Sequence, residues 1–232
     1  MSLPLFLVGS LPGEGAFRLD GPEGHHAADV QRITAGERLL LGDGRGGLAT
    51  AVVTGARKGV LDLDVEGVEH VSAPAPAITV VQGIAKGERG ELAVQLMTEL
   101  GVDRIVPWQA ARSIARWKDA KPLERWRSTV REAVKQSRRP WVPEVTEPVR
   151  RLDLAGFVLV LHEEAAVPLS AVELPSREIT LVVGPEGGIA PEELDTLTAA
   201  GARPVRLGRE VLRTSSAGAA AIAALSVRLG RW

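Results

Sequence analysis

The sequence predicts a small β-rich domain followed by an α/β domain. The chain has 232 residues, a length that fits one small and one medium domain. Short strand-like segments fill the first part, and uninterrupted apolar runs alternate with helical patterns in the rest. Apolar runs without alternation are typical of parallel strands buried on both faces. We therefore predict a small β-barrel over residues 1–71, a proline-rich linker over 72–77 and an α/β domain over 78–232.

The predicted barrel depends on four short segments of strand character that are separated by turns. In the last of them Leu61, Leu63 and Val65 alternate with acidic residues, a period of two that is typical of a half-exposed strand. Several short strands at this spacing favour a barrel. The segments are LPLFLVG, RLLLGDG, LATAVVTGA and GVLDLDVEGV.

The segment GDGRGG (residues 42–47) has the spacing of a dinucleotide-binding loop. Such a loop requires a helix after it, whereas the following LATAVVTGA has strand character. Asp43-Gly44 is instead a strong signal for a hairpin turn. We therefore predict a hairpin at this position and no nucleotide site.

Five apolar stretches predict the strands of the parallel sheet, and helical patterns lie between them. Leu92, Leu96 and Leu100 fall on one face of a predicted helix that ends at Gly101 as its C-cap. A longer helix is predicted over residues 122–139. The predicted strands are 78–82, 104–108, 157–163, 179–184 and 204–208.

Composition narrows the class of protein. The absence of cysteine excludes disulfides and thiolate metal sites, and no metal-binding motif is present, so no metal is expected. No apolar run approaches the length of a bilayer span, and the N-terminus lacks the basic flank of a signal peptide. We therefore expect a cytoplasmic protein without membrane association.

The distribution of charge is more informative than the net charge of −1. Between residues 104 and 139, eleven lysines and arginines face only three acidic residues, Asp119, Glu124 and Glu132. A local basic field of this kind can hold a phosphate backbone even when the whole chain is nearly neutral.

The predicted helix over residues 122–139 carries an apolar stripe and a basic stripe on different faces. The basic stripe is either a solvated surface or, because like charges four residues apart repel each other, a face that binds an anionic partner. The apolar residues are Leu123, Trp126, Val130, Ala133 and Val134, and the basic residues are Arg127, Arg131, Lys135 and Arg138.

Two loops near the C-terminus give the strongest functional signal. They lie in VVGPEGGIAPEEL (residues 182–194) and LGREVLRTSSAGAAAIAAL (residues 207–225), and each leads from a strand into a helix. Gly184, Gly187 and Gly188 allow a close approach of the backbone to a ligand. Because ligands collect at the carboxyl ends of parallel strands, two such loops favour a ligand site over plain strand-to-helix turns.

The two segments resemble the cofactor-binding half of the SPOUT-class RNA methyltransferases. They are most similar to the RsmE-like family, which methylates N3 of a uridine in 16S ribosomal RNA. The resemblance continues upstream in RSIARW (residues 112–117) and RWRSTVREAVKQSRRPWVPEV (residues 125–145), and more loosely in GHHAADVQR (residues 24–32). It therefore covers nearly the whole chain.

The resemblance implies a SPOUT-type parallel sheet with a C-terminal trefoil knot, preceded by a PUA-like β-barrel, in a homodimer. Such a knot is a rare exception to the rule against threaded chains. The last helix, residues 214–230, is rich in small residues. These residues fit either close packing on the sheet or a dimer interface.

The resemblance also implies S-adenosyl-L-methionine as the cofactor, held mainly by backbone groups at the ends of the last three strands. The residues expected to line its pocket are Leu161, His162, Gly184, Glu186, Gly187, Gly188, Leu207, Gly208, Val211, Leu212 and Thr214.

Methyl transfer to uracil N3 requires stabilisation of a developing uracil anion, and a cationic group near the uracil oxygens would supply it. Arg213 is one candidate, with a salt bridge that anchors the knot as an equal alternative. Arg112, which the dimer partner could contribute, is the second. Glu186 is expected either to accept the proton or to cap the following helix. A thiolate mechanism is excluded because the chain has no cysteine.

The expected partner is 16S ribosomal RNA within the assembled small ribosomal subunit. The histidine pair either contacts a nucleotide or is part of a strand or turn. The chain departs from the family where Leu3–Val8 replace the usual N-terminal arginines. The expected RNA-binding residues are His25, His26, Arg32, Arg127, Arg131, Lys135 and Arg138.

Two alternative functions stay open at this point. The first is a non-catalytic RNA-binding or ribosome-assembly protein with a degenerate methyltransferase domain. The second is a methyltransferase that acts on transfer RNA or on another ribosomal position. Binding of S-adenosylmethionine would discriminate the first alternative from an enzyme.

Overall fold

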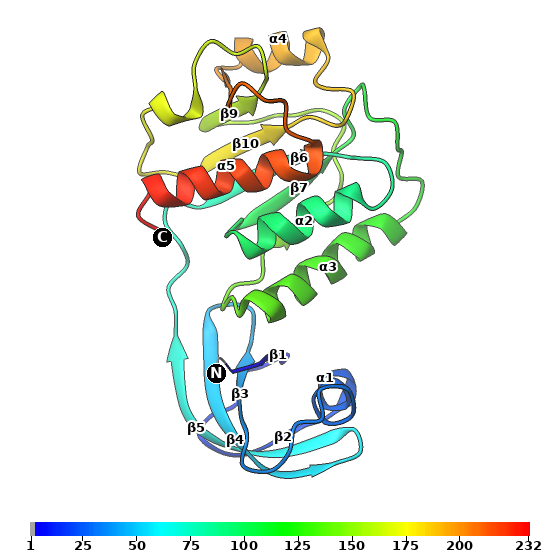
Figure 1. The fold of residues 1–232 in the computed structure, drawn as a ribbon, viewed down its shortest axis with the longest axis vertical. Coiled ribbons are helices and arrows are strands. Elements are labelled where there is room, and N and C mark those ends of the chain that lie inside the picture. The colour runs from blue at the N-terminus through cyan, green and yellow to red at the C-terminus, as the bar shows by residue number, and fades with distance from the viewer. Residues whose placement is uncertain (1–2) are drawn as a thin grey trace. The chain divides into compact units, whose positions relative to one another are not determined.

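The computed structural model describes residues 3–232, which form two compact units. One unit comprises the chain up to Ala73 together with Val134–Val142, and the other comprises Pro74–Ala133 and Pro143–Trp232. Figure 1 shows the strands of the first unit in blue and cyan and the helices and sheet of the second in green to red.

The first unit is built on a five-stranded sheet in the order β1-β3-β4-β5-β2. β1 and β3 are parallel and the other pairs are antiparallel. The inward side chains, among them Phe6, Leu39 and Leu61, are fully buried in one apolar core. The four predicted strands are confirmed, and β2 is an additional one. The strands are β1 (Leu5–Leu7), β2 (Gly15–Leu19), β3 (Arg38–Gly42), β4 (Gly47–Arg57) and β5 (Val60–His70).

The hairpin predicted at Asp43-Gly44 is confirmed, since β3 and β4 pair antiparallel on either side of it. The Asp43 carboxylate accepts the backbone N–H groups of Arg45 at 2.7 Å and Gly47 at 3.0 Å. Gly44 and Gly46 have φ angles of +70° and +97°, which disfavour any other residue. The glycines of this segment therefore serve a turn.

The histidine pair lies on a helical segment, α1 (Gly21–His25) followed by the π-helical η1 (His26–Val30), and so not on a strand or turn, which was one of the two alternatives. His25 Nδ1 lies 2.6 Å from the carboxylate of Asp29, which also accepts the Gly59 N–H at 3.3 Å. His26 is bonded to Gln31 at 3.0 Å. These side chains stabilise a short helix that has no apolar periodicity, and this explains why the sequence pattern does not reveal it.

The second unit contains a six-stranded, entirely parallel sheet in the order β11-β9-β10-β6-β7-β8. The predicted α/β class and its five main strands are confirmed, and β8 is an additional short strand. The strands are β6 (Ile78–Gly83), β7 (Arg104–Trp108), β8 (Glu144–Val145), β9 (Phe157–Leu161), β10 (Ile179–Val183) and β11 (Arg203–Val205).

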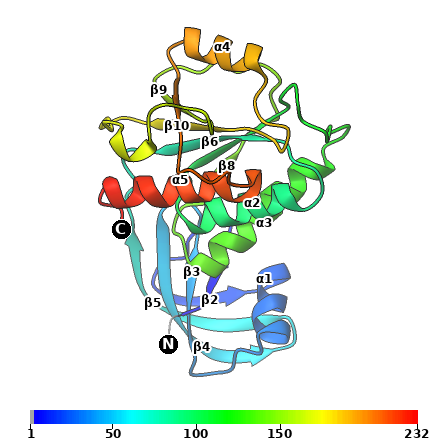
Figure 2. The ribbon, with the colours of Figure 1, turned by 45° about the horizontal axis from the view of Figure 1, so that its top comes forward.

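Helices cover both faces of this sheet. Figure 2 shows the sheet between α4 on one side and α2, α3 and α5 on the other. Leu194 and Leu197 of α4 pack with the valines on one face of β9 and β10, while α5 packs on β6, β10 and α2. The helices are α2 (Arg89–Glu99), α3 (Lys121–Ser137), α4 (Pro191–Ala199) and α5 (Thr214–Arg228).

The buried face of α2 differs from the predicted one. Ala93, Val94 and Met97 are buried, whereas Leu92 is 45% exposed. Close packing against α5 explains the difference, because a Cβ at Gly218 would lie only 2.7 Å from the Met97 sulfur. The small residues of α5 therefore pack closely in the interior, one of the two expected roles. Gly101, with a φ of +105°, ends α2 as predicted.

The apolar stripe of α3 is buried as predicted, with Leu123, Trp126 and Val130 at most 3% exposed. The helix ends at Ser137, before the predicted end at residue 139. Arg138 then adopts a φ of +55°, so it does not continue the helical stripe.

Candidate active site at the carboxyl end of the parallel sheet

Three loops of the α/β unit converge on one cavity of about 770 Å³. They follow β9, follow β10 and precede α5, so the cavity lies at the carboxyl ends of neighbouring parallel strands. In open α/β sheets, ligands bind at this end of the strands, at the point where successive strands are added on opposite sides of an earlier strand. That point lies at β6 in this sheet, because β7 is on one side of β6 and β10 and β9 are on the other.

The cavity brings together most of the predicted cofactor residues. Leu207 and Gly208 line a smaller cavity of about 70 Å³. The two cavities share Leu161, His162 and Leu212. The predicted residues that line the larger cavity are Leu161, His162, Gly184, Glu186, Gly187, Gly188, Val211, Leu212 and Thr214.

The GPEGG loop is held by contacts that tolerate only glycine. Gly188 has a φ of +73°, and a Cβ at Gly184 would lie 2.9 Å from a side-chain carbon of Ile189. The tightest approach involves Gly83, at the end of β6, where a Cβ would lie 2.5 Å from the backbone nitrogen of Pro185. Sequence reasoning missed Gly83, because the loop that it touches is a hundred residues away.

A buried chain of hydrogen bonds joins the GPEGG loop to the start of α5. The side chain of Gln82, which is fully buried, donates to the Thr214 hydroxyl at 3.0 Å. Thr214 in turn donates to the carbonyl of Gly184 at 2.7 Å. Because buried polar groups are costly when unpaired, these bonds favour one arrangement of β6, β10 and α5.

Glu186 has a different role from the expected helix cap. Its Oε1 atom accepts the backbone N–H of Lys86 at 3.0 Å and lies 3.4 Å from Nη1 of Arg89. Its Oε2 atom is shielded from solvent and has no hydrogen-bond partner in the structure. The N-terminus of α4 is capped by Glu193, which accepts the N–H of Ala190 at 3.1 Å. Glu186 therefore ties the loop after β6 to the GPEGG loop.

Three arginines of the same chain line the cavity: Arg89, Arg112 and Arg213. Arg112 lies against the GPEGG loop, with Nη1 3.4 Å from the carbonyl oxygen of Gly187. Arg213 is exposed and forms no ion pair with any residue between 3 and 232, so the described structure shows no salt bridge of the kind expected as an alternative. Arg112 reaches the cavity without a dimer partner.

Acidic side chains also line the cavity. They are Glu163, Glu164 and Asp195, and His162 lies beside them in the lining. The Glu164 N–H donates to Nδ1 of His162 at 3.2 Å. A cavity lined by both arginines and carboxylates suits a ligand that carries charges of both signs.

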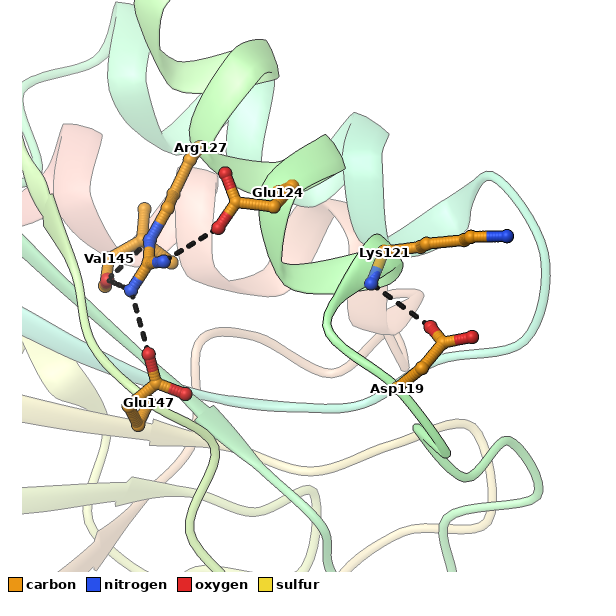
Figure 3. A network of polar contacts seen from close by, with 6 residues as sticks. All are labelled: Asp119, Lys121, Glu124, Arg127, Val145 and Glu147. Atoms are coloured by element: carbon orange, nitrogen blue, oxygen red, sulfur yellow. Dashed lines mark hydrogen bonds and ion pairs between the residues drawn. The ribbon is translucent and has the colours of Figure 1, made fainter.

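The basic stripe of α3 is partly neutralised by neighbouring carboxylates. Arg127 donates to Glu124 at 2.8 Å and to Glu147 at 3.0 Å, as Figure 3 shows. Hydrogen bonds to Glu124 and Glu147 raise the pKa of Arg127. Lys135 pairs with Glu23 at 3.2 Å, and its side chain is only 10% exposed. The continuous basic stripe predicted on α3 is therefore interrupted by these ion pairs. Among the stripe residues that lie within the helix, Arg131 is the exposed one.

Other features of the described residues bear on the class of protein. Residues 3–232 contain no group of three or more histidine, aspartate or glutamate side chains placed to hold a metal ion. No helix in the same range has the length and apolar character needed to cross a membrane. The cavity is lined by glycines, apolar side chains, arginines and carboxylates, together with His162 and Thr214.

A parallel α/β sheet with such a cavity defines a class of ligand-binding α/β proteins, and comparison with known proteins gives the family. Residues 72–226 match the family described as "RNA methyltransferase domain", and residues 19–66 match "RNA methyltransferase PUA domain". The chain belongs to this family of RNA methyltransferases. Its α/β fold with an N-terminal PUA-like domain agrees with the fold class that the sequence predicts.

Three relatives are similar over nearly the whole chain. The Mycobacterium bovis protein named ribosomal RNA small subunit methyltransferase E is 49% identical over 98% of this chain and 93% of its own. The Bacillus subtilis protein of the same name is 30% identical over 90% of this chain and 89% of its own. The solved structure of the Neisseria gonorrhoeae enzyme, bound to S-adenosyl methionine, has a TM-score of 0.89 and 31% identity, with 98% of each chain covered.

Proposed function

We propose that this protein is an S-adenosylmethionine-dependent methyltransferase that methylates N3 of a uridine in 16S ribosomal RNA. The observation that carries the proposal is the cavity in which the GPEGG loop, the loop after β9 and the start of α5 converge. Relatives that bear the name of a small-subunit ribosomal RNA methyltransferase, one of them bound to S-adenosyl methionine, support it.

The residues present fit this cofactor. The cavity volume of about 770 Å³ lies in the range of small-molecule sites. Glycine and apolar residues leave backbone groups free to hold an adenosine, and the carboxylates of Glu163, Glu164 and Asp195 can pair with an amino group. When bound, S-adenosylmethionine supplies an electrophilic methyl group on a positively charged sulfur. We assign Leu161, Gly187 and Leu212, with the other predicted lining residues, to cofactor binding.

The arginines supply the chemistry that the base needs. Uracil N3 becomes a good nucleophile only when its proton leaves, and negative charge then develops on the two ring oxygens. Arg112 and Arg213 line the cavity, and we assign both to the stabilisation of that charge. The N3 lone pair forms the new bond to the methyl carbon as the bond from carbon to sulfur breaks, and the proton passes to solvent. Because one oxygen of Glu186 is shielded and the other is bonded, we assign Glu186 to positioning.

Several finer features belong to the same proposal. We infer that the enzyme is a cytoplasmic homodimer, that its substrate is the assembled small subunit, and that α5 threads the C-terminal trefoil knot. The hydrogen bonds from Gln82 to Thr214 and from Thr214 to Gly184 support a fixed position for the start of α5. The domain boundaries at 1–71, 72–77 and 78–232 are part of the proposal, as is RNA binding by His25, His26, Arg32, Arg127, Arg131, Lys135 and Arg138.

Isothermal titration with S-adenosylmethionine, followed by a methyl-transfer assay, tests the proposal. We expect saturable binding, and transfer of one labelled methyl group to small subunits purified from cells that lack the protein. Subunits from cells that express it are the matched control and should accept none. Absence of binding up to millimolar cofactor would contradict the proposal and favour a non-catalytic assembly protein. If the protein methylates transfer RNA and not the small subunit, it is a methyltransferase with a different RNA substrate.

A further inference from the structure

A second open cavity of the α/β unit is not used by the proposed chemistry. It has a volume of about 1000 Å³ and is formed by the loop after β6, the first turns of α2 and the exposed face of α3. Lys86, Arg89 and Arg125 line it, one from each of these three elements. Lys86 and Arg89 lie in no motif of the sequence, whereas Arg125 belongs to the basic region between residues 104 and 139.

Arg89 connects this groove to the methyl-transfer cavity, because it lines both. Its guanidinium is held by Glu186, whose side chain is 17% exposed, at 3.4 Å. The same carboxylate oxygen accepts the N–H of Lys86 at 3.0 Å. Glu186 thus fixes the wall that the two cavities share, and a ligand in the groove would continue directly into the reaction site.

The groove has the chemistry of a single-stranded nucleic acid site. Lys86 and Arg125 are exposed and form no ion pair with any residue that the structure describes, so both are available to phosphates. Leu92, at 45% exposure, adds an apolar surface for a base or ribose. Glu88 and Glu91 also line the groove, and they lower its net charge without pairing Arg125. A basic groove that follows the phosphate backbone is one of the two features of such sites, and here Leu92 offers an apolar contact where other sites use aromatic side chains.

We propose that this groove binds the RNA strand next to the target nucleotide. Arg125 and Lys86 hold phosphates of the flanking nucleotides, and Arg89, positioned by Glu186, holds the phosphate at the entrance to the cavity. This inference rests on the proposed function. It adds a second face of α3 to the RNA contacts proposed above, because Arg125 lies on a different side of the helix from Arg127, whose guanidinium pairs with Glu124 and Glu147.

Steady-state methylation of small subunits by Arg125→Ala and Lys86→Ala tests the groove. Each variant should raise KM about tenfold, the effect of one charge-assisted hydrogen bond. The dependence of log kcat/KM on log salt concentration should become shallower by about 0.7 for each phosphate that the variant no longer neutralises. The affinity for S-adenosylmethionine, measured by titration, should stay at the wild-type value. Arg125→Glu should raise KM further.

Arg177→Ala is the matched control, since this exposed arginine precedes β10 and so lies at the amino end of the strand. It should retain wild-type KM and salt dependence. Wild-type KM in both Arg125 variants would overturn the proposal while leaving the methyltransferase function intact, because wild-type turnover tests that function separately. If a variant and the wild type have the same KM on a protein-free 16S RNA fragment, and the variant has a raised KM on assembled subunits only, the groove binds a ribosomal protein and the proposal is wrong. If light scattering shows that an Arg125 or Lys86 variant no longer dimerises, the groove contacts a second copy of the chain, and the proposal is likewise wrong.

Discussion

Replacement of Arg213 by alanine is expected to lower kcat by about a hundredfold, the usual loss when one group that stabilises a developing anion is removed. Arg213 lines the cavity and has no ion-pair partner between residues 3 and 232, so its loss should leave the fold and the cofactor affinity unchanged. Single-turnover methylation of small subunits, with titration of S-adenosylmethionine alongside, measures both quantities. Arg112→Ala should lower kcat by a similar factor.

The pH profile separates a catalytic role of these arginines from a structural one. If they stabilise the uracil anion, the rate of the variant should reach its plateau at a higher pH than that of the wild type. Arg209→Ala is the matched control, because this exposed arginine belongs to the same loop but lines neither cavity at the sheet end. A wild-type rate in Arg213→Ala and in Arg112→Ala would mean that another group stabilises the anion.

Replacement of Gly83 by valine is expected to weaken cofactor binding, although Gly83 does not line the cavity. A Cβ at this position would lie 2.5 Å from the nitrogen of Pro185 and 2.8 Å from the carbonyl carbon of Gly184. Backbone cannot move aside as a flexible side chain can, so the GPEGG loop must shift away from β6. Overpacking of this kind costs about 1–3 kcal/mol, which corresponds to a loss of affinity of about 10- to 100-fold.

Titration with S-adenosylmethionine and thermal unfolding together measure the effect. Gly67→Val is the control, since a Cβ at Gly67 would meet nothing within 4 Å and its φ is not positive. That variant should bind the cofactor as the wild type does. Unchanged affinity in folded Gly83→Val would show that the position of the GPEGG loop does not depend on its contact with β6.

Much of the fold could be predicted because the determining signals are local. Uninterrupted apolar runs such as Ile179–Val183 identify buried parallel strands, and Asp43-Gly44 identifies a hairpin. The ligand-binding role of the glycine-containing loops could then be predicted, because these loops follow the carboxyl ends of the predicted strands. The helix at His25 and His26 escaped prediction because its stability comes from Asp29 and the distant Gly59, and not from an apolar period.

The parts of the site that were missed depend on contacts between distant segments. Gly83, Gln82 and Arg89 act on residues of the GPEGG loop or on Thr214, about a hundred or more positions away. No local pattern marks such residues. The burial of Met97 in place of Leu92 has the same origin, because the partner of α2 is a glycine-containing face of α5. Likewise, the pairing of Lys135 with Glu23 removes a cation that the sequence presents as exposed.

Mass-spectrometric mapping of modified uridines in 16S ribosomal RNA tests the central claim most directly. RNA from cells that lack the protein should contain an unmodified uridine at one position where wild-type RNA carries N3-methyluridine. Expression of the wild-type chain should restore the modification, whereas Arg213→Ala should restore little of it. An unchanged set of N3-methyluridines in cells without the protein would contradict the account.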